Sequence, residues 1–243
     1  MKHTFKVTAL ILGLCTTGNY SHAQESSDFE VSANTGIVSD YVFRGISQSD
    51  ENFAIQGGFD VGHTTGLYAG AWASSVDFND DDEASIEIDL YAGYAGEYEN
   101  ISYDIGGLYY AYPGADSSLD YDFWEVYGSV GYNFDVASAS VGVNYSPDYF
   151  GSSGDSFYTH LGVDVPLPRN FTLSGGVGHQ AIDDNAAFGT DDYTDWNASL
   201  GYDWKNLNFS VTYHDTDLDE PSECADGCDA RIVFGITAEF GIH

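Results

Sequence analysis

The stretch that decides the fold is "SIEIDLYAGYAGEYENISYDIGGLYYAYP", residues 85–113. Its side chains alternate in polarity, with Ile86 and Leu90 in one parity and Glu87 and Asp89 in the other. Such alternation predicts β-strands, because successive side chains of a strand point to opposite faces of the sheet. The pattern raises one question, namely whether the apolar face packs in a protein core or lies against lipid.

The same period-2 alternation occurs in twelve segments along the chain. They cover residues 28–38, 52–62, 66–76, 84–96, 100–111, 121–133, 137–146, 156–166, 169–180, 192–204, 206–214 and 230–241. No stretch shows a helical period, and glycine, which costs a helix up to about 1 kcal/mol per site, is spread through the segments. The chain has no linker of distinct composition, so the segments predict a single all-β domain.

The connections between the segments alternate between long and short. Long acidic or glycine-rich connections such as "DFNDDDE" and "DTDLDEPSECADGCD" follow the odd-numbered segments, and short turns such as "GHTTG" and "DWKN" follow the even-numbered ones. Outer-membrane β-barrels have this pattern, with short periplasmic turns and longer extracellular loops around an even number of antiparallel strands. The segments are also long enough to cross the hydrocarbon layer as tilted strands.

Aromatic residues gather near both ends of the expected strands. Those expected near the long loops are Tyr109, Tyr110, Tyr112, Tyr121, Phe123 and Trp124. Those expected near the short turns are Tyr94, Tyr98, Tyr132, Phe134, Tyr202 and Trp204. Because tyrosine and tryptophan combine an apolar body with a polar tip, the two bands predict aromatic girdles at two membrane interfaces.

Loop lengths and girdles together favour a membrane barrel over a soluble sandwich. In a sandwich the apolar faces of two sheets meet, whereas in a membrane barrel the apolar face lies against lipid and the polar face lines the lumen. Closure also leaves no unpaired strand edge in lipid. The predicted fold class is all-β, a single transmembrane antiparallel β-barrel of about 12 strands in the bacterial outer membrane. The segment 66–76 fits either parity, so its facing stays open.

The N-terminus predicts export. Lys2 and Lys6 precede an apolar run and the small-x-small triplet Ser21–Ala23, so residues 1–23 are predicted to be a signal peptide and residues 24–243 the barrel. Without the signal peptide, four basic residues stand against 39 acidic ones, a formal charge of −35 compared with −33 for the whole chain. Nucleic acid is excluded as a partner, because phosphate binding depends on clustered Lys and Arg.

The cysteines fit an oxidising compartment. Cys15 lies in the predicted signal peptide, where Leu14 argues against a lipoprotein signal. Cys224 and Cys228, in "ECADGC", are predicted to form a disulfide within one loop. A zinc site would need more ligands at close spacing than this segment offers.

The parity rule predicts a lumen lined by acidic side chains. The predicted lumen-facing acids are Glu30, Asp60, Glu87, Asp89, Asp104, Glu125, Asp164, Asp195, Asp203 and Glu239. His160 and His214 share that face, and the basic residues at or near strand ends are Arg44, Arg169, Lys205 and Arg231. Carboxylates in a narrow bore concentrate cations and repel anions. We therefore expect a porin-like channel for small solutes that prefers cations, with no cofactor, metal centre or catalytic residue.

Several alternatives stay open. Inward-facing aromatic side chains are expected to narrow the bore, and they are Tyr68, Trp72, Tyr91, Tyr110, Tyr127 and Tyr158. One alternative is a plugged barrel without general conductance, and another is a barrel whose outer loops bind a partner. A hydrolase could use His160, His179 or His214 as a base beside a serine, but the chain has no GxSxG elbow.

The acidic loops raise the question of calcium. The stretch "DTDLDEPSECAD" carries Asp215, Asp217, Asp219 and Asp226, but Glu220 stands where an EF-hand needs glycine, and no predicted helix flanks the stretch. We expect a solvated acidic rim here, with no more than weak association of Ca²⁺ or Mg²⁺.

Two stretches resemble a known family. "SDYVFRGISQS", residues 39–49, and "FAIQGGFDVGHTTGLYAGAWASSVDF", residues 53–78, resemble the TorF family of bacterial outer-membrane porins. The resemblance is strongest in this N-terminal third and elsewhere concerns organisation more than motif. It implies an outer-membrane β-barrel and supplies no catalytic residues. The chain ends "EFGIH", and Phe240 precedes the terminus by three places, which departs from barrels that end in an aromatic residue.

Overall fold

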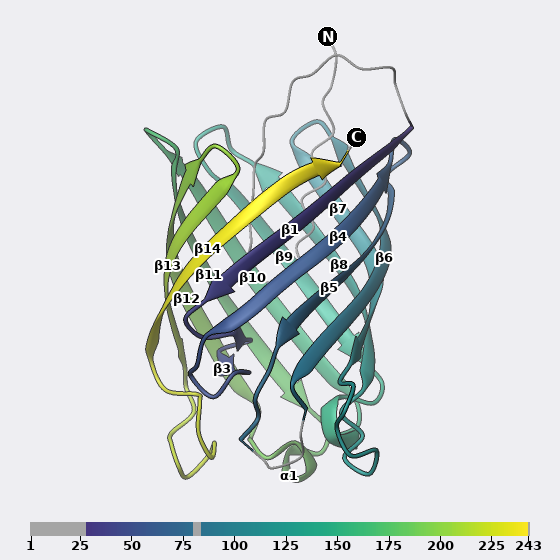
Figure 1. The fold of residues 1–243 in the computed structure, drawn as a ribbon, viewed down its shortest axis with the longest axis vertical. Coiled ribbons are helices and arrows are strands. Elements are labelled where there is room, and N and C mark those ends of the chain that lie inside the picture. Colours follow the sequence, from purple (N-terminus) through teal and green to yellow (C-terminus); the bar gives the residue numbers. More distant parts are fainter. Residues whose placement is uncertain (1–27, 80–83, 243) are drawn as a thin grey trace.

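A computed structural model describes residues 28–79 and 84–242, in which twelve antiparallel strands close into one barrel (Figure 1). The barrel strands are β1 (Phe29–Val38), β4 (Ala54–His63), β5 (Leu67–Ser75), β6 (Ile86–Tyr98), β7 (Ile101–Ala111), β8 (Phe123–Asn133), β9 (Ser138–Ser146), β10 (Ser156–Leu167), β11 (Phe171–Ile182), β12 (Tyr193–Trp204), β13 (Leu207–Thr216) and β14 (Arg231–Ile242). Each pairs with its neighbours in chain order, and β1 closes the barrel by pairing with β14. The predicted fold class is confirmed.

Each predicted segment corresponds to one barrel strand, with ends that differ by at most two residues. Elements that were not predicted lie in the long loops: β2 (Val42–Phe43), β3 (Ile46–Ser47), the 3-10 turn η1 (Phe150–Ser152) and the short helix α1 (Asn185–Phe188). Within the described part of the chain, no helix is long and apolar enough to cross a membrane. The predicted signal peptide, Cys15 and most of the "NDDDE" stretch lie outside the described residues.

The connections divide the barrel into two ends. The long loops cover residues 39–53, 76–85, 112–122, 147–155, 183–192 and 217–230, and we call their side the long-loop end. The turns at residues 64–66, 99–100, 134–137, 168–170 and 205–206 define the short-turn end. In Figure 1 the long-loop end lies at the bottom of the picture, and β14 ends at the opposite side.

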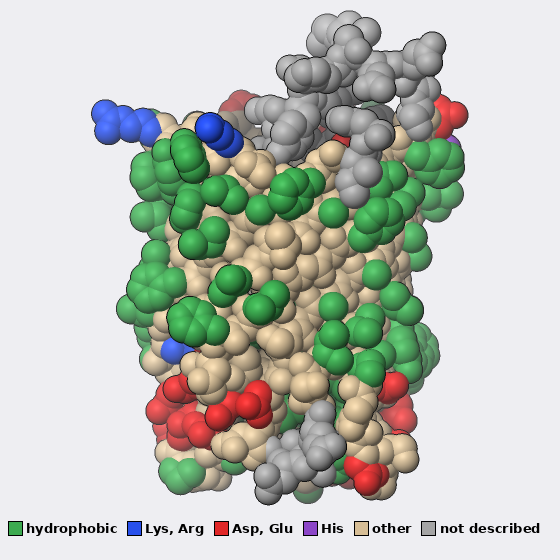
Figure 2. Space-filling view, in the orientation of Figure 1, with side chains coloured by type: hydrophobic (Ala, Val, Ile, Leu, Met, Phe, Trp, Pro, Cys, Tyr) green, Lys and Arg blue, Asp and Glu red, His purple; other side chains and the backbone are tan. Residues whose placement is uncertain are grey.

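The apolar parity of the strands faces outward. In β6, Leu90 is 53 % exposed, whereas Glu87 and Asp89 are 2 % and 0 % exposed. Figure 2 shows apolar side chains over the wall of the barrel and acidic side chains gathered toward the long-loop end. A soluble fold would bury the Ile, Val and Leu side chains, whereas a closed barrel with an apolar outer wall suits lipid. The acids of the opening stretch therefore face inward.

The facing of β5, which the sequence left open, is decided in the structure. Tyr68, Trp72 and Ser74 are buried inside the barrel, whereas Leu67 and Ala69 are exposed. The two bulky aromatic residues thus belong to the interior and the small residues to the outer wall.

The aromatic bands differ between the two ends. At the short-turn end, Tyr98 and Trp204 are exposed on the outer wall, as expected for a girdle. At the long-loop end, Tyr109 and Trp124 are exposed, but the girdle prediction is wrong for residues that pack in the interior cluster, namely Tyr110, Tyr112, Tyr121 and Phe123. Adjacent strand residues such as Tyr109 and Tyr110 face opposite sides, so a run of aromatic residues divides between lipid and bore.

Candidate functional site

The first long loop folds back into the barrel. Residues 39–53 contain the hairpin of β2 and β3, and Figure 1 shows β3 near the long-loop end of the barrel. Arg44 and Gly45 form the turn with φ of 47° and 84°, and positive φ at both central residues is the geometry of type I′ hairpins. Glycine is needed at position 45 because a Cβ atom there would lie 2.5 Å from Cγ2 of Thr216.

Arg44, at the tip of this hairpin, binds the barrel wall. Its Nη2 donates to both carboxylate oxygens of Glu125 on β8 at 2.8 Å, and its Nη1 donates to Oε1 of Gln180 on β11 at 2.9 Å. All three residues are buried. Hydrogen bonds between two charged groups are stronger than neutral ones, and removal of one partner from a buried pair costs about 3–5 kcal/mol. The hairpin is therefore held firmly in the bore.

The charge of Arg44 is secured by its surroundings. Burial is the largest single effect and would lower the pKa of Arg44, but the Glu125 carboxylate together with Tyr149, Tyr110 and Tyr158 raises that pKa well above its usual value. The Arg44 Cζ also lies 4.4 Å from the ring centroid of Tyr158, 4.7 Å from that of Phe43 and 5.7 Å from that of Tyr149. Ring faces at such distances attract cations, so Arg44 stays protonated within an aromatic enclosure.

Further bonds hold the base of the hairpin. The Tyr41 hydroxyl donates to one oxygen of Glu87 on β6 at 2.6 Å, and the Tyr112 hydroxyl donates to the other at 2.6 Å. Arg231 Nη1 at the start of β14 donates to Asp40 at 2.9 Å. These contacts join the hairpin to strands on several sides of the barrel.

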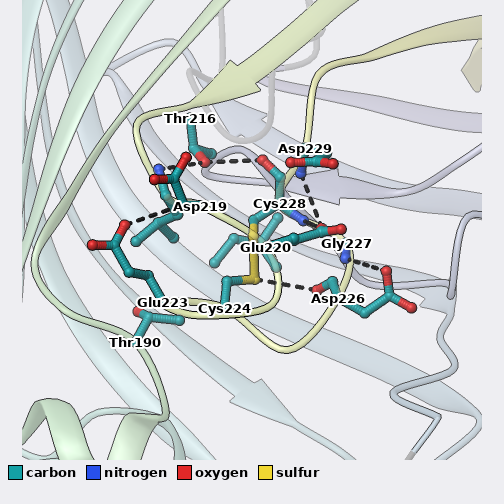
Figure 3. The surroundings of a disulfide bond; sticks show 12 residues. Thr190, Thr216, Asp219, Glu220, Glu223, Cys224, Asp226, Gly227, Cys228 and Asp229 are labelled. Carbon is teal, nitrogen blue, oxygen red and sulfur yellow. Dashed lines mark hydrogen bonds between the residues drawn. A yellow bond between two sulfur atoms is a disulfide. The ribbon is translucent and has the colours of Figure 1, made fainter.

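The hairpin also contacts the loop between β13 and β14. The Ser47 amide donates to the Gly227 carbonyl at 2.8 Å. In that loop Cys224 and Cys228 form a disulfide (Figure 3). The hairpin is thus connected to both the barrel wall and the loop that carries the disulfide.

Two cavities lie on opposite sides of the hairpin. The outer cavity, of about 350 Å³, is bounded by residues of the long loops and by many aromatic side chains. The inner cavity, of about 380 Å³, is bounded by small and polar side chains of the barrel wall and by the hairpin. Among the described residues, Phe43 alone lines both. Each volume lies in the range of small-molecule sites.

The ten predicted lumen-facing acids all lie at the inward parity of their strands and fall into two sets along the bore. The outer set lies near the long-loop end, is at most 4 % exposed, and consists of Glu87, Asp89, Glu125 and Asp195. The inner set lies nearer the short-turn end, is partly or fully exposed, and consists of Glu30, Asp60, Asp104, Asp164, Asp203 and Glu239. One sequence pattern therefore places acids in two environments.

The outer set is held by the hairpin and by large side chains. Glu87 and Glu125 receive the bonds of Tyr41 and Arg44 described above, and the Tyr158 hydroxyl donates to Asp195 at 3.0 Å. Among the described residues, neither carboxylate oxygen of Asp89 has a hydrogen-bond partner. A buried carboxyl group that accepts no hydrogen bond lowers the stability of the folded state. Asp89 is therefore expected to destabilise the folded barrel.

Four acids of the inner set accept hydrogen bonds, two from tyrosines that lie two strands away and two from small side chains of the adjacent strand. The donors are Tyr91 for Asp60, Tyr68 for Asp104 at 2.7 Å, Ser174 for Asp164 at 2.6 Å and Asn208 for Asp203 at 2.7 Å. No loop contributes to these bonds, which all come from the barrel wall. Within the described part of the chain, these four acids are therefore bonded by side chains of the strands.

The six aromatic residues expected in the bore all face the interior. Four of them lie against the wall over glycines of a neighbouring strand, namely Tyr68 over Gly93, Tyr91 over Gly70, Tyr127 over Gly106 and Tyr158 over Gly178. A Cβ atom at Gly70 would lie 2.4 Å from Cζ of Tyr91, and one at Gly178 would lie 2.0 Å from the Tyr158 hydroxyl. Because glycine leaves room for the ring, these tyrosines narrow the bore less than their size suggests.

The histidines and the remaining basic residues lie in different parts of the barrel. His160 and His214 line the inner cavity, but His179 is exposed on the outer wall with Nδ1 3.2 Å from Oγ1 of Thr194, so it does not face the bore. Arg169 and Lys205 lie in short turns. The sequence pattern places Arg44 near a strand end and predicts no partner for it, because Arg-Gly is not one of the residue pairs that mark a type I′ hairpin.

The acidic loops show one close group of potential metal ligands. Among the described residues, only Glu220, Cys224 and Cys228 bring three ligand atoms within 4.8 Å of one another. The two sulfur atoms are joined, and Oε1 of Glu220 accepts from the amides of Cys228 and Asp229 at 2.8 and 3.1 Å (Figure 3). The expected weak association of Ca²⁺ or Mg²⁺ with the acidic loops stays a prediction.

Comparisons with known proteins agree with this geometry. A family model described as "Bacterial protein of unknown function (Gcw_chp)" matches residues 22–240. The chain is similar to the NanC porin, with a TM-score of 0.57 and 11 % identity over 87 % of this chain and 100 % of that chain. It is also similar to a membrane protein solved in work on in-meso crystallization, with a TM-score of 0.52 and 8 % identity over 88 % and 84 % of the two chains.

An outer-membrane channel from Pseudomonas putida F1 has a TM-score of 0.49 and 11 % identity over 93 % of this chain and 100 % of that chain. A comparison with curated proteins finds no match. At these identities the likeness shows the fold alone, a closed β-barrel like that of porins. With its apolar outer wall, this fold places the protein in the bacterial outer membrane.

Proposed function

The chain belongs to the Gcw_chp family of bacterial proteins of unknown function, and we propose that it is an outer-membrane channel that passes small cations in preference to anions. The observation that carries this proposal is the charge of the bore. Ten acidic side chains face it, and the two basic side chains at the hairpin, Arg44 and Arg231, are each paired with a carboxylate. Charge in a narrow, low-dielectric bore is poorly screened, so the surplus of carboxylates attracts cations.

The resemblance of residues 39–49 and 53–78 to the TorF porins supports the same proposal, and membership of that family stays a prediction. The predicted division into a signal peptide, residues 1–23, and a barrel, residues 24–243, belongs to the proposal as well, since an outer-membrane protein must be exported.

A salt gradient across a planar bilayer tests the ion preference. We expect refolded protein to give a reversal potential on the side of cation permeation, because the bore repels anions. The gel mobility of the sample with and without heating serves as a control for barrel closure. A reversal potential on the side of anion permeation would contradict the proposal.

A plugged barrel is the second candidate, and the hairpin between the two cavities favours it. Removal of residues 42–47 separates the two candidates. The Gln48 amide donates to the Tyr41 carbonyl at 2.6 Å, so a Gly-Gly bridge can join these residues without disturbing the barrel strands. We expect the intact channel to conduct and this variant to conduct severalfold more, because the hairpin narrows the path. Current in the variant alone would favour the plugged barrel.

A further inference from the structure

The outer cavity has a wall of aromatic rings. Tyr121 and Phe150 stack with their centroids 4.3 Å apart, and Phe78 meets each of them edge-on at 5.6 Å. These three rings and Phe188 line the cavity of about 350 Å³ and are only partly buried, so part of their surface borders the cavity. Such a volume with aromatic walls is typical of small-molecule sites.

Four residues that line the same cavity are acidic. Asp50, Glu51, Asp77 and Asp226 line it, and no Lys or Arg is among its described lining residues. Glu51 is paired with Arg231 at 3.3 Å, so the countercharge for a ligand comes from the three aspartates. Asp226 belongs to the disulfide loop, where its backbone carbonyl lies 3.3 Å from the sulfur of Cys224 (Figure 3). The disulfide and the bonds to Glu220 hold this part of the cavity wall in place. The charge of the site is therefore complementary to a cation.

Two rings of this cavity already contact a cation within the protein. Phe43 and Tyr149 line the outer cavity, and the guanidinium of Arg44 lies over both rings from the hairpin. The face of an aromatic ring attracts a cation because its quadrupole is negative there. The aromatic set around the hairpin thus combines apolar surface with an affinity for positive charge.

We propose that the outer cavity binds small organic cations with an aromatic or apolar body, such as aryl-substituted quaternary ammonium ions. The rings supply stacking and cation–π contacts, and the carboxylates supply the countercharge. A cavity of about 350 Å³ lies at the small end of ligand sites, which limits the body to about one ring. This inference rests on the proposed function, because it names the class of solute that the channel would take. Binding to the cavity, however, can occur whether or not the barrel conducts.

Calorimetry on refolded protein in detergent tests the binding with three probes. Benzyltrimethylammonium combines the ring and the cation, phenylmethanesulfonate carries a similar ring with negative charge, and maltose is a neutral sugar. We expect saturable heat for benzyltrimethylammonium alone. No saturable heat with this cation, or equal binding of the sulfonate or of maltose, would overturn the inference.

Matched variants locate the site. Tyr121→Leu and Asp226→Asn are expected to weaken binding of benzyltrimethylammonium by about three- to tenfold each. Asparagine retains the oxygen that accepts from the Gly227 amide at 2.9 Å, so the loop is preserved. The controls are Trp124→Leu on the outer wall and Asp229→Asn, which does not line the cavity. Equal losses in the controls would overturn the assignment of the site.

Current block by benzyltrimethylammonium separates this inference from the proposed function. In a conducting channel we expect stronger block from the long-loop side, and Tyr121→Leu should relieve it. If calorimetry shows binding but the bilayer shows no current, the proposed channel function is contradicted and the proposed binding site is supported. If the bilayer shows a cation-selective current but calorimetry shows no binding, the proposed binding site is contradicted and the proposed channel function is supported.

Discussion

The outer and inner halves of the bore carry acids of the same parity in different surroundings. In the outer half, Glu87 and Glu125 are almost fully buried and bonded to Tyr41 and Arg44 of a loop that folds inward. In the inner half, acids such as Asp164 are partly exposed and bonded within the wall. Strand parity therefore decides which way a carboxylate points, whereas the loop that packs on it decides how much water it retains.

This difference has an energetic side. Interactions of buried charges are strong, and the loss of one partner leaves the other charge without compensation. Interactions of exposed charges are weak because water screens them. We therefore expect substitutions in the outer half to change stability and substitutions in the inner half to change ion preference.

The largest effect is expected at the hairpin. Arg44→Leu leaves Glu125 buried without its ion pair and should lower the free energy of unfolding by about 3–5 kcal/mol. Urea unfolding of the refolded barrel measures it. The double variant Arg44→Leu/Glu125→Leu should recover most of the loss, because it removes both charges together. An exposed ion pair contributes up to about 1 kcal/mol. A loss of stability below that value in the single variant would show that buried pairs of the outer half are no stronger than exposed ones.

A gain in stability is expected at Asp89. Its oxygens have no hydrogen-bond partner among the described residues, so Asp89→Leu should raise the free energy of unfolding by about 1–3 kcal/mol. Asp104→Leu is the matched comparison, because it removes a carboxylate that accepts from Tyr68 and should lower stability. Urea unfolding of both variants measures the two changes in the free energy of unfolding. A lower free energy of unfolding for Asp89→Leu would contradict the interpretation.

The smallest change in stability is expected at Asp164. Asp164→Asn keeps an oxygen for the Ser174 hydroxyl and should change the free energy of unfolding by no more than about 0.5 kcal/mol. Because the bore loses one negative charge, the reversal potential in a salt gradient should move toward anion permeation. Asp229→Asn, in an outer loop and away from the bore cavities, is the control. An unchanged reversal potential would mean that the inner acids do not set the ion preference.

Much of the barrel could be predicted because its pattern is local. The parity of Leu90 against Glu87 and Asp89 is visible within a few residues, and it decided the facing of β6. In β5 the same reasoning failed, because small residues and bulky aromatic residues such as Trp72 suit both sides of the wall. Only pairing with β4 and β6 decided the facing there.

The aromatic band at the long-loop end illustrates another limit. Their position along the strand predicts that Tyr110 and Phe123 belong to a girdle, but they pack in the interior with centroids 4.2 Å apart. Position along a strand gives depth in the membrane, whereas parity gives the face, and both are needed. A run of aromatic residues at a strand end is therefore shared between lipid and bore.

The sequence by itself determined the number of strands, the alternation of long and short connections and the inward facing of the acids, because each depends on neighbours in the chain. Only the tertiary structure decided that the first long loop enters the bore and divides it. Arg44 reaches Glu125 and Gln180, which lie 81 and 136 positions away. Such contacts exist only after closure has brought β8 and β11 around the hairpin, so no local pattern records them.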